Sequence, residues 1–157
     1  MLFTGDTERS IDDKHRLSIP TEMRIGFSMG AGLSVVYASP GPTGGVWLWP
    51  EATFESMANS FEQSLLPDEN VMEFEQILFS QSRRLEIDKA GRIRLPEALL
   101  QFAGVGSQAV VIGVRDHLEI RDPAQWNAIR DENLAKLSQI MLRARGQGKQ
   151  SPTGESQ

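Results

Sequence analysis

The sequence predicts an α+β fold built from two tandem copies of one unit. Two segments, 11–20 and 87–96, share the pattern apolar-Asp-x-x-x-Arg-apolar-x-apolar-Pro, with Asp12 and Asp88 standing 76 positions apart. The order of strands and helices around these segments also repeats. Internal repetition of this kind indicates one supersecondary unit used twice. The 157 residues are therefore interpreted as two small repeats that share a core.

The second copy shows the unit most clearly. Residues 84–88 and 92–96 alternate apolar and polar side chains, as strands with one buried face do, and a glycine between them favours a tight turn. The sequence therefore predicts a short hairpin. Pro96 then suits the first turn of a helix that ends before Gly104. The first copy follows the same plan, from a strand ending at Ile11 to a short helix.

A second hairpin is predicted in each half. Residues 33–37 and 46–49 are strand-like and flank a Pro/Gly loop, whereas residues 109–114 and 117–121 flank a much tighter turn. Each hairpin then leads into a helix. The predicted boundaries are a first repeat over 7–54, an acidic helical linker over 55–82, a second repeat over 83–126, a C-terminal helix over 127–145 and a disordered tail over 146–157.

The helices outside the repeats are predicted from their amphipathic spacing. Residues 54–65 and 71–79 are expected to form two helices broken near Pro67. A further helix from Pro123 carries a stripe of apolar side chains, which we expect to pack against the protein's own core. The tail that follows is rich in glycine, glutamine and serine, a composition typical of disorder.

Composition excludes several classes of protein. The absence of cysteine rules out disulfides, thiolate nucleophiles and cysteine-based zinc sites. The first ten residues are polar and acidic, unlike a signal peptide, and no apolar stretch approaches the roughly 18 residues that span a bilayer. We therefore expect a soluble cytoplasmic protein with no membrane partner.

The charge distribution is more informative than the net charge of −5. Residues 50–75 carry seven acids and no Lys or Arg, whereas residues 83–94 carry five bases against two acids. Local field decides where an anionic ligand docks, so the basic segment favours a nucleic-acid partner despite the acidic total. A solvated surface with scattered charges explains the same pattern equally well.

Catalysis has little support in the sequence. His15 and His117 are expected in turns of different hairpins, and neither has a metal-ligating side chain three or four residues further on. The glycines of 41–45 lack the Lys-Ser/Thr of a phosphate loop. The prediction is a protein that is not an enzyme and that needs no metal or cofactor.

The Asp-x-x-x-Arg pattern has two possible roles. Across a tight turn the Asp and Arg can form a hydrogen-bonded pair, which at an exposed site stabilises the turn by at most about 1 kcal/mol. Alternatively, Asp12 and Asp88 act as structural braces that orient Arg16 and Arg92 toward phosphate or the O6/N7 edge of guanine. Further phosphate contacts are predicted from four nearby cations, Lys14, Arg24, Lys89 and Arg94. Spacing alone does not choose between these roles.

The sequence resembles the MraZ family of bacterial regulators, whose signature is two Asp-x-x-x-Arg motifs in tandem repeats of the AbrB/SpoVT swapped-hairpin type. The resemblance spans residues 2–143. One such motif would be weak evidence, but two in register with matching flanks are specific. The matching segments are 12–20, 47–50, 79–80, 88–96 and 119–122.

The resemblance implies a swapped-hairpin barrel and a repressor that binds promoter DNA. Its expected partners are double-stranded DNA with repeated boxes upstream of the division and cell-wall gene cluster, its own promoter included, and further copies of itself in a closed ring on the nucleoid. Carried over by position, the DNA contacts are Arg16 and Lys14 from the first motif and Lys89, Arg92 and Arg94 from the second. A ring-forming protein scaffold, in which the Asp–Arg pairs only brace the hairpins, is the alternative.

Two positions depart from the family pattern. His15 stands where the family usually has glycine before the first arginine, so that turn must accommodate a side chain at positive φ. Thr4 stands where many members have arginine, so one basic contact is missing. Both departures affect the first motif, and the second is the more basic of the two.

Overall fold

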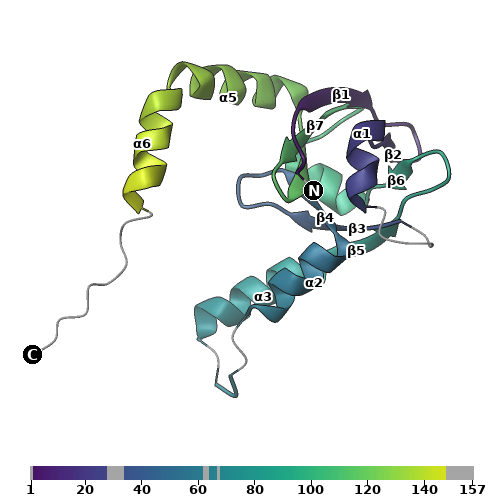
Figure 1. Ribbon diagram of the computed structural model, residues 1–157. Helices are drawn as coiled ribbons and strands as arrows, with labels where there is room; N and C mark the ends of the chain where they lie inside the picture. The colour runs from purple at the N-terminus through teal and green to yellow at the C-terminus, as the bar shows by residue number, and fades with distance from the viewer. Residues whose placement is uncertain (1, 28–33, 62–63, 67, 148–157) are drawn as a thin grey trace, which may run out of the picture. The chain divides into compact units, whose positions relative to one another are not determined.

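A computed structural model describes residues 2–27, 34–61, 64–66 and 68–147 (Figure 1). It confirms the α+β fold, and the chain divides into two compact units, Met1–Pro123 and Ala124–Gln157. The elements of the first unit are β1 (Asp6–Ser10), β2 (Arg16–Ser18), α1 (Thr21–Arg24), the 3-10 helix η1 (Ile25–Phe27), β3 (Val35–Pro40), β4 (Val46–Pro50), α2 (Glu51–Asn59), α3 (Glu69–Gln81), β5 (Arg83–Glu86), β6 (Arg92–Arg94), α4 (Glu97–Ala103), β7 (Gln108–Val114) and β8 (His117–Arg121).

The strands form a six-stranded antiparallel sheet in the order β1-β7-β8-β4-β3-β5 and a two-stranded sheet of β2 and β6. The predicted hairpins β3–β4 and β7–β8 are both present. Every other pairing joins one repeat to the other: β1 to β7, β5 to β3, β2 to β6 and β4 to β8. The two repeats therefore exchange strands, which is the swapped-hairpin arrangement that the family resemblance implied.

The prediction that residues 84–88 pair with 92–96 as a simple hairpin is wrong. The tight turn between them exists, since the N–H of Asp88 donates to the carbonyl of Arg92 at 2.9 Å. The flanking strands, however, pair with the opposite repeat, β5 with β3 and β6 with β2. Backbone N–H and C=O groups in a sheet need partners, and strands of the first repeat supply them for β5 and β6.

The core lies where the inward faces of both repeats meet. Leu17 and Ile93 of the two-stranded sheet are fully buried, as are Leu48 and Leu118 of the six-stranded sheet. Because side chains alternate between the faces of a strand, burial of Leu17 and Ile93 turns their neighbours in sequence outward. The core thereby determines which side chains β2 and β6 present on the surface.

The linking helices begin and end at positions that differ from the prediction. The helix predicted over 54–65 is α2, which starts at Glu51 directly after Pro50. The helix predicted over 71–79 is α3, capped by Asp68, whose carboxylate accepts the N–H of Asn70 at 2.7 Å. Proline and aspartate are common at helix starts, so both beginnings follow local rules. Pro67, the predicted break, lies outside the described residues.

The second unit holds two helices, α5 (Pro123–Ala135) and α6 (Leu137–Gln147), in place of the single C-terminal helix that was predicted. Lys136 separates them. Within the second unit itself no described side chain of α5 or α6 is buried, and the packing of their apolar stripe against a core stays a prediction. The disordered tail was predicted over 146–157; residues 146 and 147 belong to α6 instead, and residues 148–157 lie outside the described residues. None of the described helices is both long enough and apolar enough to cross a membrane.

His117 is buried and is the first residue of β8, the strand predicted over 117–121, so it lies just after the turn in which it was expected. Its ring stacks on Trp47 and Trp49, with centroids 4.1 and 4.7 Å away. Its Nδ1 lies 2.8 Å from Asp116 Oδ1 and its Nε2 lies 3.5 Å from Glu119 Oε1. Burial alone would lower the pKa of His117, but hydrogen bonds with Glu119 and Asp116 outweigh it and raise the pKa above its usual value.

This environment predicts a pH-dependent contribution to stability. Because the pKa of His117 is raised on folding, its stabilising effect is complete below the unfolded pKa of about 6.5 and is lost as pH rises through the folded pKa. The melting temperature measured from pH 5.5 to 8.5 should therefore fall more steeply for the natural protein than for His117→Gln. Equal slopes for the two proteins would contradict the prediction.

Candidate nucleic-acid interface

The first Asp-x-x-x-Arg turn is organised by one carboxylate. Asp12 Oδ1 accepts the backbone N–H of Lys14 at 3.0 Å and that of Arg16 at 2.8 Å. Its Oδ2 accepts Nε of the Arg16 side chain at 2.7 Å. The carboxylate thus fixes both the path of the backbone and the direction of the guanidinium.

The second turn repeats this arrangement atom for atom. Asp88 Oδ1 accepts the N–H of Ala90 and that of Arg92, each at 2.9 Å, and its Oδ2 accepts Arg92 Nε at 3.0 Å. The backbone N–H of the following arginine is the main cause that lowers the pKa of both Asp12 and Asp88, with the side-chain bond adding to it. Both carboxylates therefore stay ionised and both arginines stay paired near neutral pH.

The two turns lie side by side because β2 and β6 pair with each other. Arg16 stands opposite Arg94, and Arg92 stands opposite Ser18. We call these four outward residues the basic strip. Two further hydrogen bonds of 2.9 Å join the turns, one from the Leu95 N–H to the His15 carbonyl and one from the Ile19 N–H to the Gly91 carbonyl. Sequence reasoning treated the motifs as separate hairpins and missed this juxtaposition, since no local signal reports which strand pairs with which.

The basic strip leaves positive charge available at the surface. Arg16 and Arg92 use Nε for their aspartates, and their terminal nitrogens make no bond to any residue that the structure describes; the two side chains are 32% and 36% exposed. Within the described part of the chain, Lys14, Lys89 and Arg94 have no side-chain hydrogen bond or ion pair. Arginines directly opposite each other, as Arg16 and Arg94 are, repel. An anion placed between them would relieve that repulsion.

Comparison with known proteins identifies the family of the chain. Residues 78–148 match the family model described as "MraZ protein, putative antitoxin-like". A "Transcriptional regulator MraZ" of Roseiflexus castenholzii is 31% identical over 147 residues, covering 92% of this chain and 99% of the relative. One of Thermomicrobium roseum is 32% identical over 127 residues, covering 81% and 86%, and one of Mesoplasma florum is 29% identical over 140 residues, covering 89% and 93%.

The chain belongs to the MraZ family. The family model covers the second repeat, whereas the full-length MraZ relatives extend the similarity over both motifs. The resemblance noted from the two Asp-x-x-x-Arg segments is therefore confirmed.

His15, the departure from the MraZ pattern, has φ of +60°, close to the +78° of Gly91 at the matching position. The turn thus requires a left-handed residue in both copies. A residue with a Cβ reaches that conformation at a cost of roughly 1–2 kcal/mol, which glycine avoids. The expected positive φ is present, and the surrounding hydrogen bonds hold His15 there.

Arg24 of this MraZ chain is half-buried and hydrogen-bonded within its own repeat. Its Nε donates to the Ile19 carbonyl at 2.9 Å and its Nη2 donates to the Thr21 hydroxyl at 3.2 Å. Its guanidinium lies against Gly91, where a Cβ would overlap it. A phosphate contact by Arg24 stays a prediction, but the geometry supports a role in holding the second turn in place.

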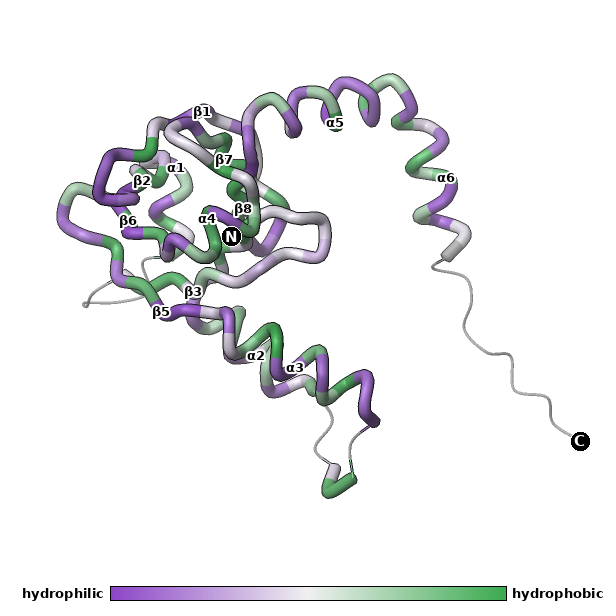
Figure 2. Tube along the Cα trace, turned by 180° about the vertical axis from the view of Figure 1, so that it is seen from behind, coloured by the Kyte–Doolittle hydropathy of each residue, from purple (hydrophilic) through white to green (hydrophobic). Residues whose placement is uncertain are grey.

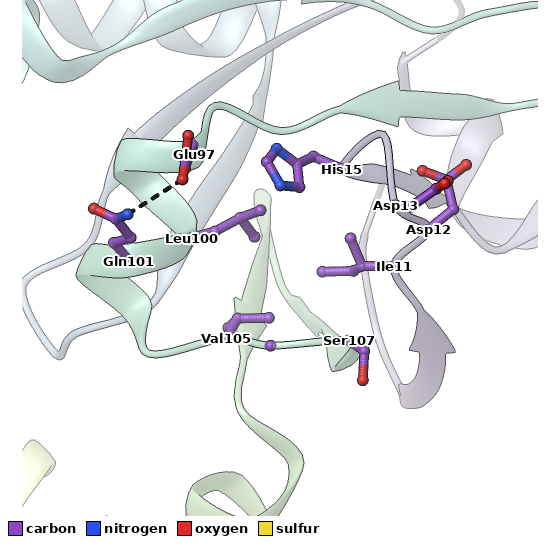
Figure 3. A pocket seen from close by; sticks show the side chains of 10 residues that line it. Ile11, Asp12, Asp13, His15, Glu97, Leu100, Gln101, Val105 and Ser107 are labelled. Carbon is purple, nitrogen blue, oxygen red and sulfur yellow. Dashed lines mark hydrogen bonds between the residues drawn. The ribbon is translucent and has the colours of Figure 1, made fainter.

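The first turn has a different neighbour at the equivalent point. Arg24 lies four residues after Pro20, and the matching residue of the second repeat, four after Pro96, is Leu100. Figure 3 shows His15 extending from its turn toward α4. The pocket there, about 470 Å³, is lined by His15, Asp12, Asp13, Glu97 and mainly apolar neighbours. Among the described residues, no three His, Asp or Glu side chains are placed to hold a metal ion.

Proposed function

We propose that this protein is a sequence-specific DNA-binding regulator, a repressor of the division and cell-wall gene cluster that also acts on its own promoter. The basic strip carries this proposal, because it places the two oriented arginines Arg16 and Arg92 beside Arg94 on one narrow surface, with Lys14 and Lys89 in the adjoining turns. The relatives are named transcriptional regulators, which agrees with a nucleic-acid partner.

The shape of the strip suits the DNA major groove. That groove admits a two-stranded β-ribbon, and arginine pairs bidentately with guanine O6 and N7. Arg16 and Arg92 would read bases with their free terminal nitrogens, since Asp12 and Asp88 already fix their direction. Lys14, Lys89 and Arg94 would contact phosphates and fix the register of the ribbon on the duplex.

Assembly would strengthen a contact that is weak in one copy. A few basic side chains bind DNA with modest affinity and strong salt dependence. In a closed ring of copies, engagement of one strip raises the effective concentration of the others, and avidity can rise by ~10²–10⁴. This favours operators made of repeated boxes and predicts association with the nucleoid.

Binding to the upstream region of its own gene tests the proposal. Fluorescence anisotropy with the purified full chain should show binding to that region at least ten times tighter than to a shuffled duplex of equal length and composition at about 150 mM salt. The alternative function, a protein-binding scaffold in which the Asp–Arg pairs only brace the turns, predicts no binding to either duplex. Equal affinity for both duplexes would contradict sequence-specific regulation.

A further inference from the structure

An apolar groove lies against the helical hairpin of α2 and α3. It has a volume of about 430 Å³, and its lining includes Trp49, Met57, Phe74, Ile77 and Phe102. Phe74, Ile77 and Phe102 are between 51% and 63% exposed. Figure 2 shows α2 and α3 extending from the β3 and β5 side of the barrel, away from β2 and β6. Large apolar side chains left open in this way mark an interaction site.

The rim of this groove is strongly acidic. Residues 50–82 contain seven acids and no Lys or Arg. Arg84 of β5 pairs with Glu51 at 3.0 Å, and no ion pair is recorded for the other described acids of the hairpin. Those acids are Glu55, Asp68, Glu69, Glu73 and Glu75. A partner for this groove must therefore offer an apolar ridge flanked by positive charge.

Helix α6 of this same sequence has that chemistry. Leu137, Ile140, Met141 and Ala144 follow the spacing i, i+3, i+4, i+7 that places anchors on one helix face. Leu137 is 49% and Met141 63% exposed. From 136 to 150 the chain carries Lys136, Arg143, Arg145 and Lys149 and no acid. The apolar face and the basic flank thus match the groove in both properties.

We propose that α6 of one copy docks into the α2–α3 groove of a second copy, apolar face inward. The contact is head-to-tail, because each copy offers a helix at one place and a groove at another. Contacts of this type close into rings when the rotation between copies allows it. The inference rests on the assembly included in the proposed function and assigns the surfaces that build it, whereas DNA binding by one strip does not depend on it.

A symmetric contact between two grooves fits the observations less well. It would bring two acidic rims together, and like charges without intervening cations repel. Docking of α6 into the groove of its own chain would satisfy the same chemistry but would leave the protein monomeric. Oligomeric state therefore separates the proposed occupant from both alternatives.

Two variants of the full chain test the proposal by mass measurement with light scattering. Leu137→Glu blocks the helix and Ile77→Glu blocks the groove, and both side chains are about half exposed or more, so folding should be retained. Each variant alone should be a monomer, whereas the natural protein should be an oligomer. The matched controls Gln139→Glu on α6 and Gln76→Glu on α3 should assemble like the natural protein.

Mixing the two variants gives the decisive result. A head-to-tail contact leaves one working helix on the groove variant and one working groove on the helix variant, so the mixture should form a heterodimer and nothing larger. Any of three results would overturn the proposal. The mixture could stay monomeric, or the helix variant could assemble normally. The natural protein could also be monomeric at about 50–100 times the concentration used for DNA binding.

Failure of this inference can be told apart from failure of the proposed function. The monomeric variants should bind a duplex with a single box as tightly as one strip of the natural protein does, and lose only the avidity for repeated boxes. If each variant assembles like the natural protein and DNA binding is specific, only the proposed docking of α6 into the groove is refuted. If the two variants lose assembly but the natural protein does not bind the promoter DNA, only the proposed regulatory function is refuted.

Discussion

Replacing Arg16 with alanine should weaken promoter binding by about 10- to 100-fold for each strip that contacts DNA. A bidentate arginine–guanine pair contributes about 1–3 kcal/mol of discrimination, and each 1.4 kcal/mol is tenfold. The effect is large because Asp12 holds the guanidinium in place at 2.7 Å, so that little side-chain freedom is lost on binding. Titration of a labelled promoter duplex measures the loss.

Salt dependence separates base reading from phosphate contact. Each phosphate contact contributes a slope of about −0.9 in log affinity against log salt. Arg16→Lys keeps the charge but not the planar fork, so it should keep the slope of the natural protein and lose most of the specificity. Arg94→Ala should instead make the slope shallower by about 0.9, the contribution of one phosphate contact, with little change in specificity.

The outcome for Arg16 has a matched control. Arg9→Ala removes a half-buried arginine of β1 that lies outside the basic strip, and it should leave both affinity and slope unchanged. Arg92→Ala should resemble Arg16→Ala, since the two turns share the same hydrogen bonds. If Arg16→Ala and Arg9→Ala bind the promoter equally well, the strip is not the reading surface.

Gly113→Ala should lower the free energy of unfolding by about 2–3 kcal/mol, a large effect for the addition of one methyl group. Gly113 lies in β7, and a Cβ there would come within 2.6 Å of the carbonyl carbon and oxygen of Thr4. The clash is with backbone, which cannot rotate away as a side-chain tip can. Its N–H also donates to the Gly5 carbonyl at 2.7 Å, which ties the N-terminal segment to the sheet.

Displacement of that segment would reach the core. Phe3 is buried and packs on Phe27 with ring centroids 5.1 Å apart. Urea denaturation should therefore show a lower midpoint for Gly113→Ala. Gly106→Ala is the control, since nothing lies within 4 Å of its Cβ position and its φ is not positive. Equal stability of the two variants would show that the N-terminal segment can shift without cost.

The local parts of the site were predictable from sequence. An Asp four residues before an Arg, with a turn-forming residue between, encodes hydrogen bonds that close within five residues. The positive φ at His15 followed from its alignment with Gly91, and the structure confirms it, with φ of +60° at His15 and +78° at Gly91. Helix starts at Pro96 and Pro123 followed from capping rules that involve only neighbouring residues.

Features that depend on distant partners were harder to predict. The apolar stripe after Pro123 was expected to enter a core, because an amphipathic pattern shows that a face needs covering but does not say what covers it. Arg24 was grouped with the DNA-contacting cations by charge alone, and that contact stays a prediction. In the structure its Nε is bonded to the Ile19 carbonyl at 2.9 Å, an interaction that no sequence pattern announces.

The sequence by itself determined the duplication, the two aspartate-braced turns and which residues of each strand face outward. Only the tertiary structure decided that β2 pairs with β6, so that Arg16 faces Arg94 and both motifs join in one basic strip. The physical reason is that period-two alternation specifies the face of a strand but not its partner. Pairing between repeats is settled by burial of Leu17 and Ile93 in a shared core, and the surface that we propose for DNA follows from that burial.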